Sequence, residues 1–316
     1  MPHGAGSREI RRFFGTQNCW SRNGCRMVLG AVLRRSTMSI GGTGFNVKKF
    51  QSLLATKDVG RTIVYKPNMT STMDEADKLS KSGCPSGSAV LADSQTHGRG
   101  RNNRIWTSAS PSNLYVSFIL RPKSFDQVIN INFAAPLAVA MAADSSGGVS
   151  DAKVKWPNDV WVGSRKLAGI LLNTMASGGT SQLTVNLGIG VNVNQDMSEV
   201  KEIAKGEATS LFLENGEKRV EREAFLADLC QHLEDLISLQ RNDLMQIYQK
   251  YDILLGKEIV VMPNKKEDPS TYYMAKAVEY SKEGYLVVED CKGGEKKILS
   301  AEEVSIRPGD QPRQAK

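Results

Sequence analysis

Residues 155–174 read KWPNDVWVGSRKLAGILLNT, and this stretch decides the fold class of the chain. Its apolar runs predict strands at Lys153–Trp156, extended at Val160–Val162, and at Lys166–Thr174, with VGSRK as a tight turn before the last of them. A further strand at Leu183–Asn194 follows the turn-forming ASGGTS. Consecutive strands joined by short turns, with the helices set apart from them, predict an α+β fold with an antiparallel or mixed sheet.

Two helices and two strands are predicted upstream of this stretch. In MTSTMDEADKLSKSG (69–83), Thr72 is the expected N-cap, Glu75 completes a capping box, and Gly83 ends the helix. The strands are SAVLADS (88–94) and NLYVSFIL (113–120), and the second helix is the alanine-rich, buried INFAAPLAVAMAAD (131–144).

Downstream, EREAFLADLCQHLEDLISL predicts an amphipathic helix. Its apolar face consists of Phe225, Leu229, Leu233, Leu236 and Leu239. From Gly256 onward the chain consists of short strands separated by turns (GKEIVVM, YYMAKAVEYS, GYLVVEDC and KKILS), which predicts a small β-barrel. A domain boundary is therefore expected near residue 254.

The net charge of +7 is concentrated at the N-terminus. Residues 1–40 hold seven arginines against one acid, so the rest of the chain is nearly neutral, which argues against a general nucleic-acid surface. An acid-poor, arginine-rich leader over residues 1–45 predicts a transit peptide for a chloroplast or a mitochondrion, with a plain basic tail as the alternative. Met27 and Met38 are candidate internal starts that would give a cytosolic form. No apolar run is as long as the ~18 residues of a membrane span, so no such span is expected.

The loop SQTHGRGRNNRIW (94–106) places three arginines, two glycines and two asparagines between two predicted strands. It does not fit a dinucleotide-binding loop, because the third glycine is missing and a strand follows where a helix N-terminus should hold the pyrophosphate. The Walker pattern also fails, because no GKS or GKT follows. By itself the loop is a weak signal for an anion site, with a solvated hairpin as an equal alternative.

Two further segments bring polar groups to the ends of predicted strands. Around a proline-containing bend, one amide, one carboxylate and two ammonium groups are found at Lys155, Asn158, Asp159 and Lys166. The following KLAGILLN is apolar enough to be buried, which puts Lys166 at the mouth of a buried strand, although Asn and Asp at such a bend can be plain turn formers. In LGIGVNVN (187–194), Gly188 and Gly190 would leave room for a ligand against the strand, with the amide of Asn192 nearby.

Taken together and in this order, STM, ADSQTHGRGRNNRIW, NLYVSFIL, VKWPND, RKLAGIL and LGIGVNVN resemble the motifs of the biotin–protein ligases. This family includes the holocarboxylase synthetases and the bacterial biotin operon repressor, and the resemblance covers residues 60–310. It implies a class II aminoacyl-tRNA-synthetase-like catalytic domain with a mixed, largely antiparallel sheet over residues 46–254. An SH3-like β-barrel would follow over residues 255–316.

The resemblance implies a reaction in two steps. Biotin and ATP, with Mg²⁺, form biotinyl-5′-adenylate and pyrophosphate. The ε-amine of one lysine on a biotin carboxyl carrier domain, such as that of acetyl-CoA carboxylase, then takes the biotinyl group. No tightly bound prosthetic group, DNA or membrane partner is expected, and the protein would be a monomer or a weak homodimer.

The family's functional residues can be carried over to the matching positions. The catalytic residues would be Lys166, Arg99 and Asp159. Biotin would contact Ser71, Thr72, Met73, Gln95, Arg99, Gly100, Arg101, Lys166 and Gly169. ATP and the adenylate would contact Arg101, Arg104, Trp106, Asn158, Lys166 and Asn192. Trp106 is expected to stack on adenine, and Asp159 is the expected Mg²⁺ ligand.

Two positions depart from the family pattern. Asn103 stands where the bacterial repressor has glycine, and Met73 replaces a commoner asparagine, which removes one polar contact to biotin. The leader is too short and too poor in apolar periodicity for a helix-turn-helix, so operator binding is not expected. Two alternatives stay open: a lipoate–protein ligase of the same fold with a longer apolar tunnel, and a non-catalytic biotin-binding or nucleic-acid-binding module.

Overall fold

The computed structural model describes residues 44–101, 104–108, 111–176, 183–204, 207–263, 269–300 and 304–308. Most of the predicted leader lies outside these residues, as does Asn103. Phe45, which the predicted boundary assigns to the leader, is only 4% exposed and packs against Phe50 and Tyr65. The hydrophobic core therefore includes the last residue of that segment.

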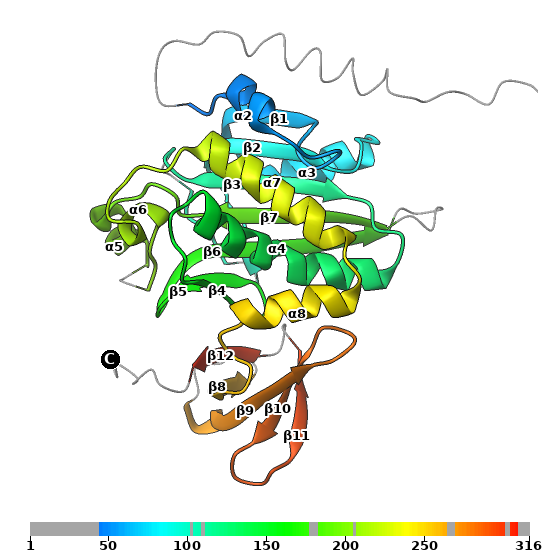
Figure 1. Cartoon of the computed structure of the whole chain (residues 1–316), viewed down its shortest axis with the longest axis vertical. Helices are drawn as coiled ribbons and strands as arrows, with labels where there is room; N and C mark the ends of the chain where they lie inside the picture. Colours follow the sequence, from blue (N-terminus) through cyan, green and yellow to red (C-terminus); the bar gives the residue numbers. More distant parts are fainter. Residues whose placement is uncertain are drawn as a thin grey trace, which may run out of the picture. The chain divides into compact units, whose positions relative to one another are not determined.

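A seven-stranded sheet forms the centre of the first part of the fold (Figure 1), in the order β1-β2-β3-β7-β6-β5-β4. The strands are β1 (Ile63–Met69), β2 (Ser88–Gln95), β3 (Leu114–Leu120), β4 (Ala152–Lys155), β5 (Asp159–Val162), β6 (Arg165–Ala176) and β7 (Leu183–Val191). Among the described pairs, β1 and β2 run parallel and all the others run antiparallel. The predicted α+β class with a mixed, largely antiparallel sheet is confirmed.

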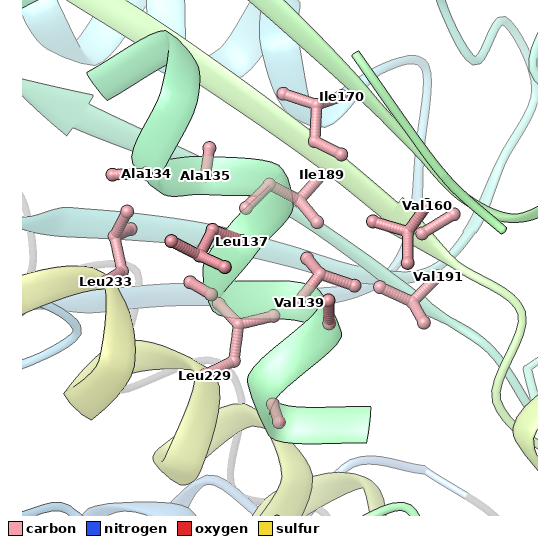
Figure 2. Close-up of a cluster of buried hydrophobic side chains, with 14 of the residues drawn as sticks. Ala134, Ala135, Leu137, Val139, Val160, Ile170, Ile189, Val191, Leu229 and Leu233 are labelled. Carbon is pink, nitrogen blue, oxygen red and sulfur yellow. The ribbon is translucent and has the colours of Figure 1, made fainter. Parts of the chain in front are cut away.

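Two helices, α4 (Phe125–Ser145) and α7 (Arg222–Ser238), cover one face of this sheet (Figure 1). Figure 2 shows Leu229 of α7 facing Leu137 and Val139 of α4, with Ile189 of β7 on the far side of α4. Because α4 is enclosed by the sheet on one side and α7 on the other, it is apolar on nearly all of its faces.

The composition of α4 also meets the length and hydropathy of a membrane span, with a mean hydropathy of 1.3 over its most apolar window. The expectation that no apolar segment reaches this length is therefore wrong. However, 72% of that window is buried inside the fold, so α4 is accounted for as a core helix.

The opposite face of the sheet carries α3 (Thr72–Lys81), because Met73 lies against Gly188 of β7 while the next residue of that strand faces α4. The predicted capping box is wrong. The N-cap is Ser71, and the N–H of Thr72 donates to Gln95 Oε1 (2.8 Å). A tertiary contact has therefore replaced the local cap.

Four further helices complete the first part: α2 (Val47–Leu53), α5 (Met197–Ala204), α6 (Leu211–Glu214) and α8 (Arg241–Tyr251). Asn46 caps α2 by accepting the N–H of Lys49 (3.0 Å), and Phe50 then buries its ring completely. At the surface, Lys49 of this helix forms an ion pair with Glu221, the N-cap residue of α7.

The C-terminal part forms a second, antiparallel sheet in the order β11-β10-β9-β8-β12. Its elements are β8 (Glu258–Pro263), the one-turn 3-10 helix η2 (Pro269–Thr271), β9 (Tyr273–Tyr280), β10 (Leu286–Asp290), β11 (Lys296–Leu299) and β12 (Val304–Pro308). Phe133 of α4, Tyr248 of α8 and Tyr280 of β9 pack edge to face, with ring centroids 4.9 to 5.6 Å apart. These three rings join the second sheet to the core helices.

Candidate active site

The chain after β2 folds back on itself, so that residues 98–101 lie beside residues 104–106. These two described segments are called the glycine–arginine loop. Gly100 N–H donates to the carbonyl of Arg104 (2.8 Å), and Trp106 N–H donates to that of Gly98 (2.9 Å). A Cβ on Gly98 would collide with the carbonyl of Trp106, so the tight return requires glycine there. Arg104 lies exposed on this loop.

Arg99 is paired with helix α3. Its Nη1 lies 2.8 Å from Asp74 Oδ1 and 3.7 Å from Asp77 Oδ2. The side chains of Arg99 and Asp74 are 41% and 40% exposed. An ion pair that is so exposed to solvent contributes no more than about 1 kcal/mol to the stability of the fold. Asp74 is therefore a partner that a ligand carboxylate or phosphate can replace, and it was not among the predicted site residues.

Arg101 joins the loop to the turn between β4 and β5. Its Nη1 donates to Asn158 Oδ1 (2.9 Å). The Nδ2 of Asn158 donates to the carbonyl of Ile170 (2.6 Å), and the carbonyl of Asn158 accepts the Ile170 N–H (2.8 Å). Asn158 is thus fixed on β6 and offers its amide oxygen to the loop.

Lys166 lies between a carboxylate and an aromatic ring. Its Nζ is 2.7 Å from Asp159 Oδ1 and 5.2 Å from the centroid of the Trp106 ring. Asp159 Oδ1 is buried and within ion-pair distance of Lys166, yet it makes no hydrogen bond of regular geometry in the described structure. The register of β5 and β6 places Asp159 opposite Gly169, so the carboxylate, the ammonium and the ring share one face of the sheet.

Two glycines that pair across β6 and β7 form a flat platform for Trp106. A Cβ on Gly169 would lie 2.7 Å from Trp106 Cζ3, and one on Gly190 would lie 2.6 Å from its Nε1. At the next glycine of β7, Gly188, a Cβ would lie 2.7 Å from Met73 Sδ. The expectation that Gly188 and Gly190 leave open space needs correction, because side chains of the protein lie there.

A chain of hydrogen bonds links the predicted biotin-binding residues. Ser117 Oγ donates to Thr72 Oγ1 (2.8 Å), which donates to Gln95 Oε1 (3.1 Å). Gln95 Nε2 donates in turn to Ser108 Oγ (2.9 Å). Ser71, by contrast, is 2% exposed, and its Oγ lacks a hydrogen-bond partner in the described structure. An unpaired buried hydroxyl costs about 1–3 kcal/mol, so Ser71 is the group of this cluster best placed to gain from a ligand.

A cleft of about 560 Å³ lies between the glycine–arginine loop and strand β6. Its lining includes Arg99, Gly100, Arg101, Arg104 and Asn158, five of the predicted site residues. The lining also includes Asn132 of α4 and Pro157, which were not among the predicted site residues. The other predicted site residues are not part of this lining: Ser71, Thr72, Met73, Gln95, Trp106, Asp159, Lys166, Gly169 and Asn192. Trp106 covers the platform formed by Gly169 and Gly190.

Asn192 has a structural contact where a nucleotide contact was expected. Its Nδ2 donates to the carbonyl of Thr209 (2.9 Å), and the N–H of Thr209 donates to the carbonyl of Lys166 (2.9 Å). Asn192 thereby holds the segment that runs beside Lys166.

Tyr115 of β3 lies opposite Gly190, and burial raises the pKa of its phenol to about 12, so it stays protonated at neutral pH.

For a metal ion, the predicted ligand is the carboxylate of Asp159, which pairs with Lys166. Among residues placed by the structure, no three His, Cys, Asp or Glu side chains gather into a metal-binding group. Mg²⁺ is commonly held by one or two carboxylates while substrate phosphates complete its coordination. Asp159, with an oxygen that lacks a regular hydrogen bond, fits that arrangement.

Comparisons with known proteins place this site in a family. Residues 65–192 match the model of the biotin/lipoate A/B protein ligase family. The bifunctional ligase/repressor BirA of Bacillus spizizenii is 31% identical over 258 residues, which are 79% of this chain and 75% of that protein. The chloroplastic biotin–protein ligase 1 of Arabidopsis thaliana is 27% identical over 252 residues, 77% of this chain and 66% of that protein. The structure of the Aquifex aeolicus biotin protein ligase in complex with biotin and ATP matches with a TM-score of 0.62 and 27% identity, over 78% of this chain and 99% of that chain. This chain belongs to the biotin/lipoate A/B protein ligase family and, within it, to the biotin–protein ligases.

Proposed function

We propose that this protein is an ATP-dependent biotin–protein ligase, which activates biotin as biotinyl-5′-AMP and transfers it to one lysine of a biotin carboxyl carrier domain. Family membership supports this reaction, and the Aquifex aeolicus relative binds both biotin and ATP. One structural observation carries the proposal. The cations Arg99, Arg101 and Lys166 each contact a side-chain oxygen that a ligand oxygen can replace.

The activation step brings the biotin carboxylate against the triphosphate. At 4 Å and an effective dielectric of 20, each pair of unit negative charges repels by roughly 4 kcal/mol, so cations must surround the reacting oxygens. Arg99 and Lys166 would bind the carboxylate and the α-phosphate. Arg101 and Arg104 would hold the adenylate phosphate or the departing pyrophosphate. Arg99 would leave Asp74 as the ligand arrives.

Asp159 is the group through which the chain would hold Mg²⁺ on the nucleotide. When bound, the ion neutralises phosphate charge and orients the triphosphate. Asp159 also forms an ion pair with Lys166, with 2.7 Å between Oδ1 and Nζ, and so holds the ammonium beside the ring of Trp106.

Biotin would be recognised around the N-terminus of α3. The ureido ring is polar but neutral, so its binding needs donors and acceptors that are not committed elsewhere. Ser71 Oγ has none of its bonding capacity used in the described structure, whereas Thr72 and Gln95 already bond to each other. Ser71 is therefore the proposed principal side-chain contact, with Met73 and Gly169 lining the apolar side.

The acyl-adenylate hydrolyses readily, so the site must exclude water until the carrier lysine attacks. The glycine–arginine loop can do this by closing over the ligand, because its glycines permit the change in backbone shape and its arginines follow the bound anions. Trp106 would move with the loop and pack against the adenylate. The carrier amine then needs positioning more than a protein base, since the leaving group is already activated.

The test is release of pyrophosphate by the purified chain with ATP and Mg²⁺, in the presence of biotin, of lipoate, or of neither acid. We expect release with biotin alone, followed by a mass increase of one biotinyl group on a single lysine of an acetyl-CoA carboxylase carrier domain. Activity with lipoate but not with biotin would assign the chain to the lipoate branch. No release with either acid would overturn the ligase proposal.

A further inference from the structure

The turn between β9 and β10, residues 281–285, reaches from the C-terminal sheet to the first part of the fold. Gly284 N–H donates to the carbonyl of Ser281 (3.0 Å), and Ser281 N–H donates to that of Tyr285 (2.9 Å), so the turn closes on itself. Gly284 has a φ of 86° and lies so close to α4 that a Cβ would come within 3.0 Å of Ile129 Cγ2. The turn is therefore closed by its own hydrogen bonds and lies against α4.

The carbonyl of Gly284 accepts a hydrogen bond from Trp156 Nε1 (3.1 Å), and this bond is buried. Trp156 is 2% exposed and immediately precedes the turn that carries Asn158 and Asp159. Asn158 meets Arg101, and Asp159 meets Lys166. A continuous set of contacts thus runs from the C-terminal sheet through one indole N–H to the cations of the cleft.

We propose that Trp156 is a positioning residue, through which the 281–285 turn fixes the Asn158–Asp159 turn at the active site. The inference deepens the proposed ligase function and rests on it for its kinetic test. A buried tryptophan often serves only as core, so the decisive element is the N–H. Its bond joins the start of the Asn158–Asp159 turn directly to the backbone of the 281–285 turn.

The substitution that isolates this bond is Trp156→Phe, which keeps an aromatic ring and removes the donor. Tyr280→Phe is the matched control, because it removes a hydroxyl donor to Asp252 in the same region and does not touch the Asn158–Asp159 turn. Both changes lower the thermal stability. Only Trp156→Phe should raise the KM for ATP in biotin-dependent pyrophosphate release, by about fivefold, the size of one lost neutral hydrogen bond.

A double-mutant cycle tests whether the effect passes through Asn158. In the Asn158→Ala background, adding Trp156→Phe should leave the KM unchanged, since the group being positioned is gone. Multiplicative effects of the two changes would overturn the proposal, as would an equal rise in KM for Tyr280→Phe.

Amide hydrogen exchange of the ligand-free chain gives a readout that is independent of activity. The Ile170 N–H, which donates to the carbonyl of Asn158, should exchange about fivefold faster in Trp156→Phe than in Tyr280→Phe. Equal exchange in the two variants would refute the positioning role. An inactive wild-type protein would remove the ligase proposal, while the exchange comparison would still decide this one.

Discussion

Arg101 and Asn158, 57 residues apart in the sequence, are joined by a 2.9 Å hydrogen bond from the guanidinium to the amide oxygen. Through it the glycine–arginine loop is attached to a turn that is itself fixed on β6 by two further bonds at Ile170. The loop is therefore anchored at Arg101, whereas Arg104 and Ile105 on its returning segment lie exposed. Closure over a ligand must either keep this contact or exchange it for one to phosphate.

Lys166→Ala should reduce biotin-dependent pyrophosphate release on the order of 10²–10³-fold, because it removes a preorganised charge from the reacting oxygens. The fold should persist, since Lys166 is only partly buried, with 30% of its side chain exposed. Lys276→Ala, on an exposed position of β9, is the control and should retain full activity. Near-normal release by Lys166→Ala would refute its assigned role.

Arg99→Gly should allow the adenylate to escape, because the loop would lose the cation that holds it over the bound anions. Mass spectrometry of a mixture of the carrier domain and bystander proteins should then detect biotin on many lysines. Asp74→Asn removes the resting partner of Arg99 but keeps the arginine, so its labelling should stay specific. If Arg99→Gly also labels the carrier lysine alone, loop closure does not protect the adenylate.

Gly190→Ala should weaken ATP binding about tenfold and lower the free energy of unfolding by about 1–3 kcal/mol, the usual cost of overpacking. The new methyl group would displace the Trp106 ring from its platform, since it would lie 2.6 Å from the indole nitrogen. Calorimetric titration with ATP and chemical denaturation measure the two effects. Gly293→Ala provides the comparison, because a Cβ there meets no atom within 4 Å.

Asp252 should make the protein less stable as the pH rises above 4. Burial raises the pKa of this carboxyl in the folded protein, against the opposing effect of hydrogen bonds from Tyr280 and two backbone amides. The folded state thus binds the proton more tightly than the unfolded chain, so the contribution is complete below the ordinary pKa of about 3.9 and is lost through the raised one.

The corresponding measurement is the free energy of unfolding of the wild type and of Asp252→Asn between pH 4 and pH 8. The difference in free energy of unfolding between the wild type and Asp252→Asn should become less favourable to the wild type as the pH increases. Asp290→Asn is the comparison, because backbone N–H groups and Lys297 lower the pKa of Asp290. The advantage of the wild type over Asp290→Asn should stay nearly constant from about pH 5 upward and be lost only as the pH falls below about 4, through the lowered pKa. Parallel curves for the wild type and Asp252→Asn would contradict the assignment.

The elements predicted most accurately are those whose pattern matches their burial. Leu229 and Leu233 repeat at helical spacing and are fully buried in α7. Strand β1 was not predicted, because Lys66, Pro67 and Asn68 break its apolar pattern. As an edge strand paired only with β2 in the described sheet, β1 tolerates a proline that an inner strand would not.

The residues of the site could be named from the motifs, but their contacts could not. The pairing of Arg99 with Asp74 depends on where the loop returns relative to α3, and no local pattern encodes that path. The N-cap is Ser71 and not the predicted Thr72 for the same reason. Gln95 on β2 accepts the N–H of Thr72, which the predicted capping box would otherwise satisfy. Tertiary partners decided both outcomes.

The ring cluster of Phe133, Tyr248 and Tyr280 has a practical consequence for truncated variants. Phe133 and Tyr248 belong to helices, whereas Tyr280 comes from β9. Ending the chain after α8 would therefore expose the buried rings of Phe133 and Tyr248 to solvent. Such a fragment would expose a hydrophobic surface and aggregate. A loss of activity in it would then give no information about the catalytic role of the C-terminal sheet. Expression trials should therefore retain both sheets together.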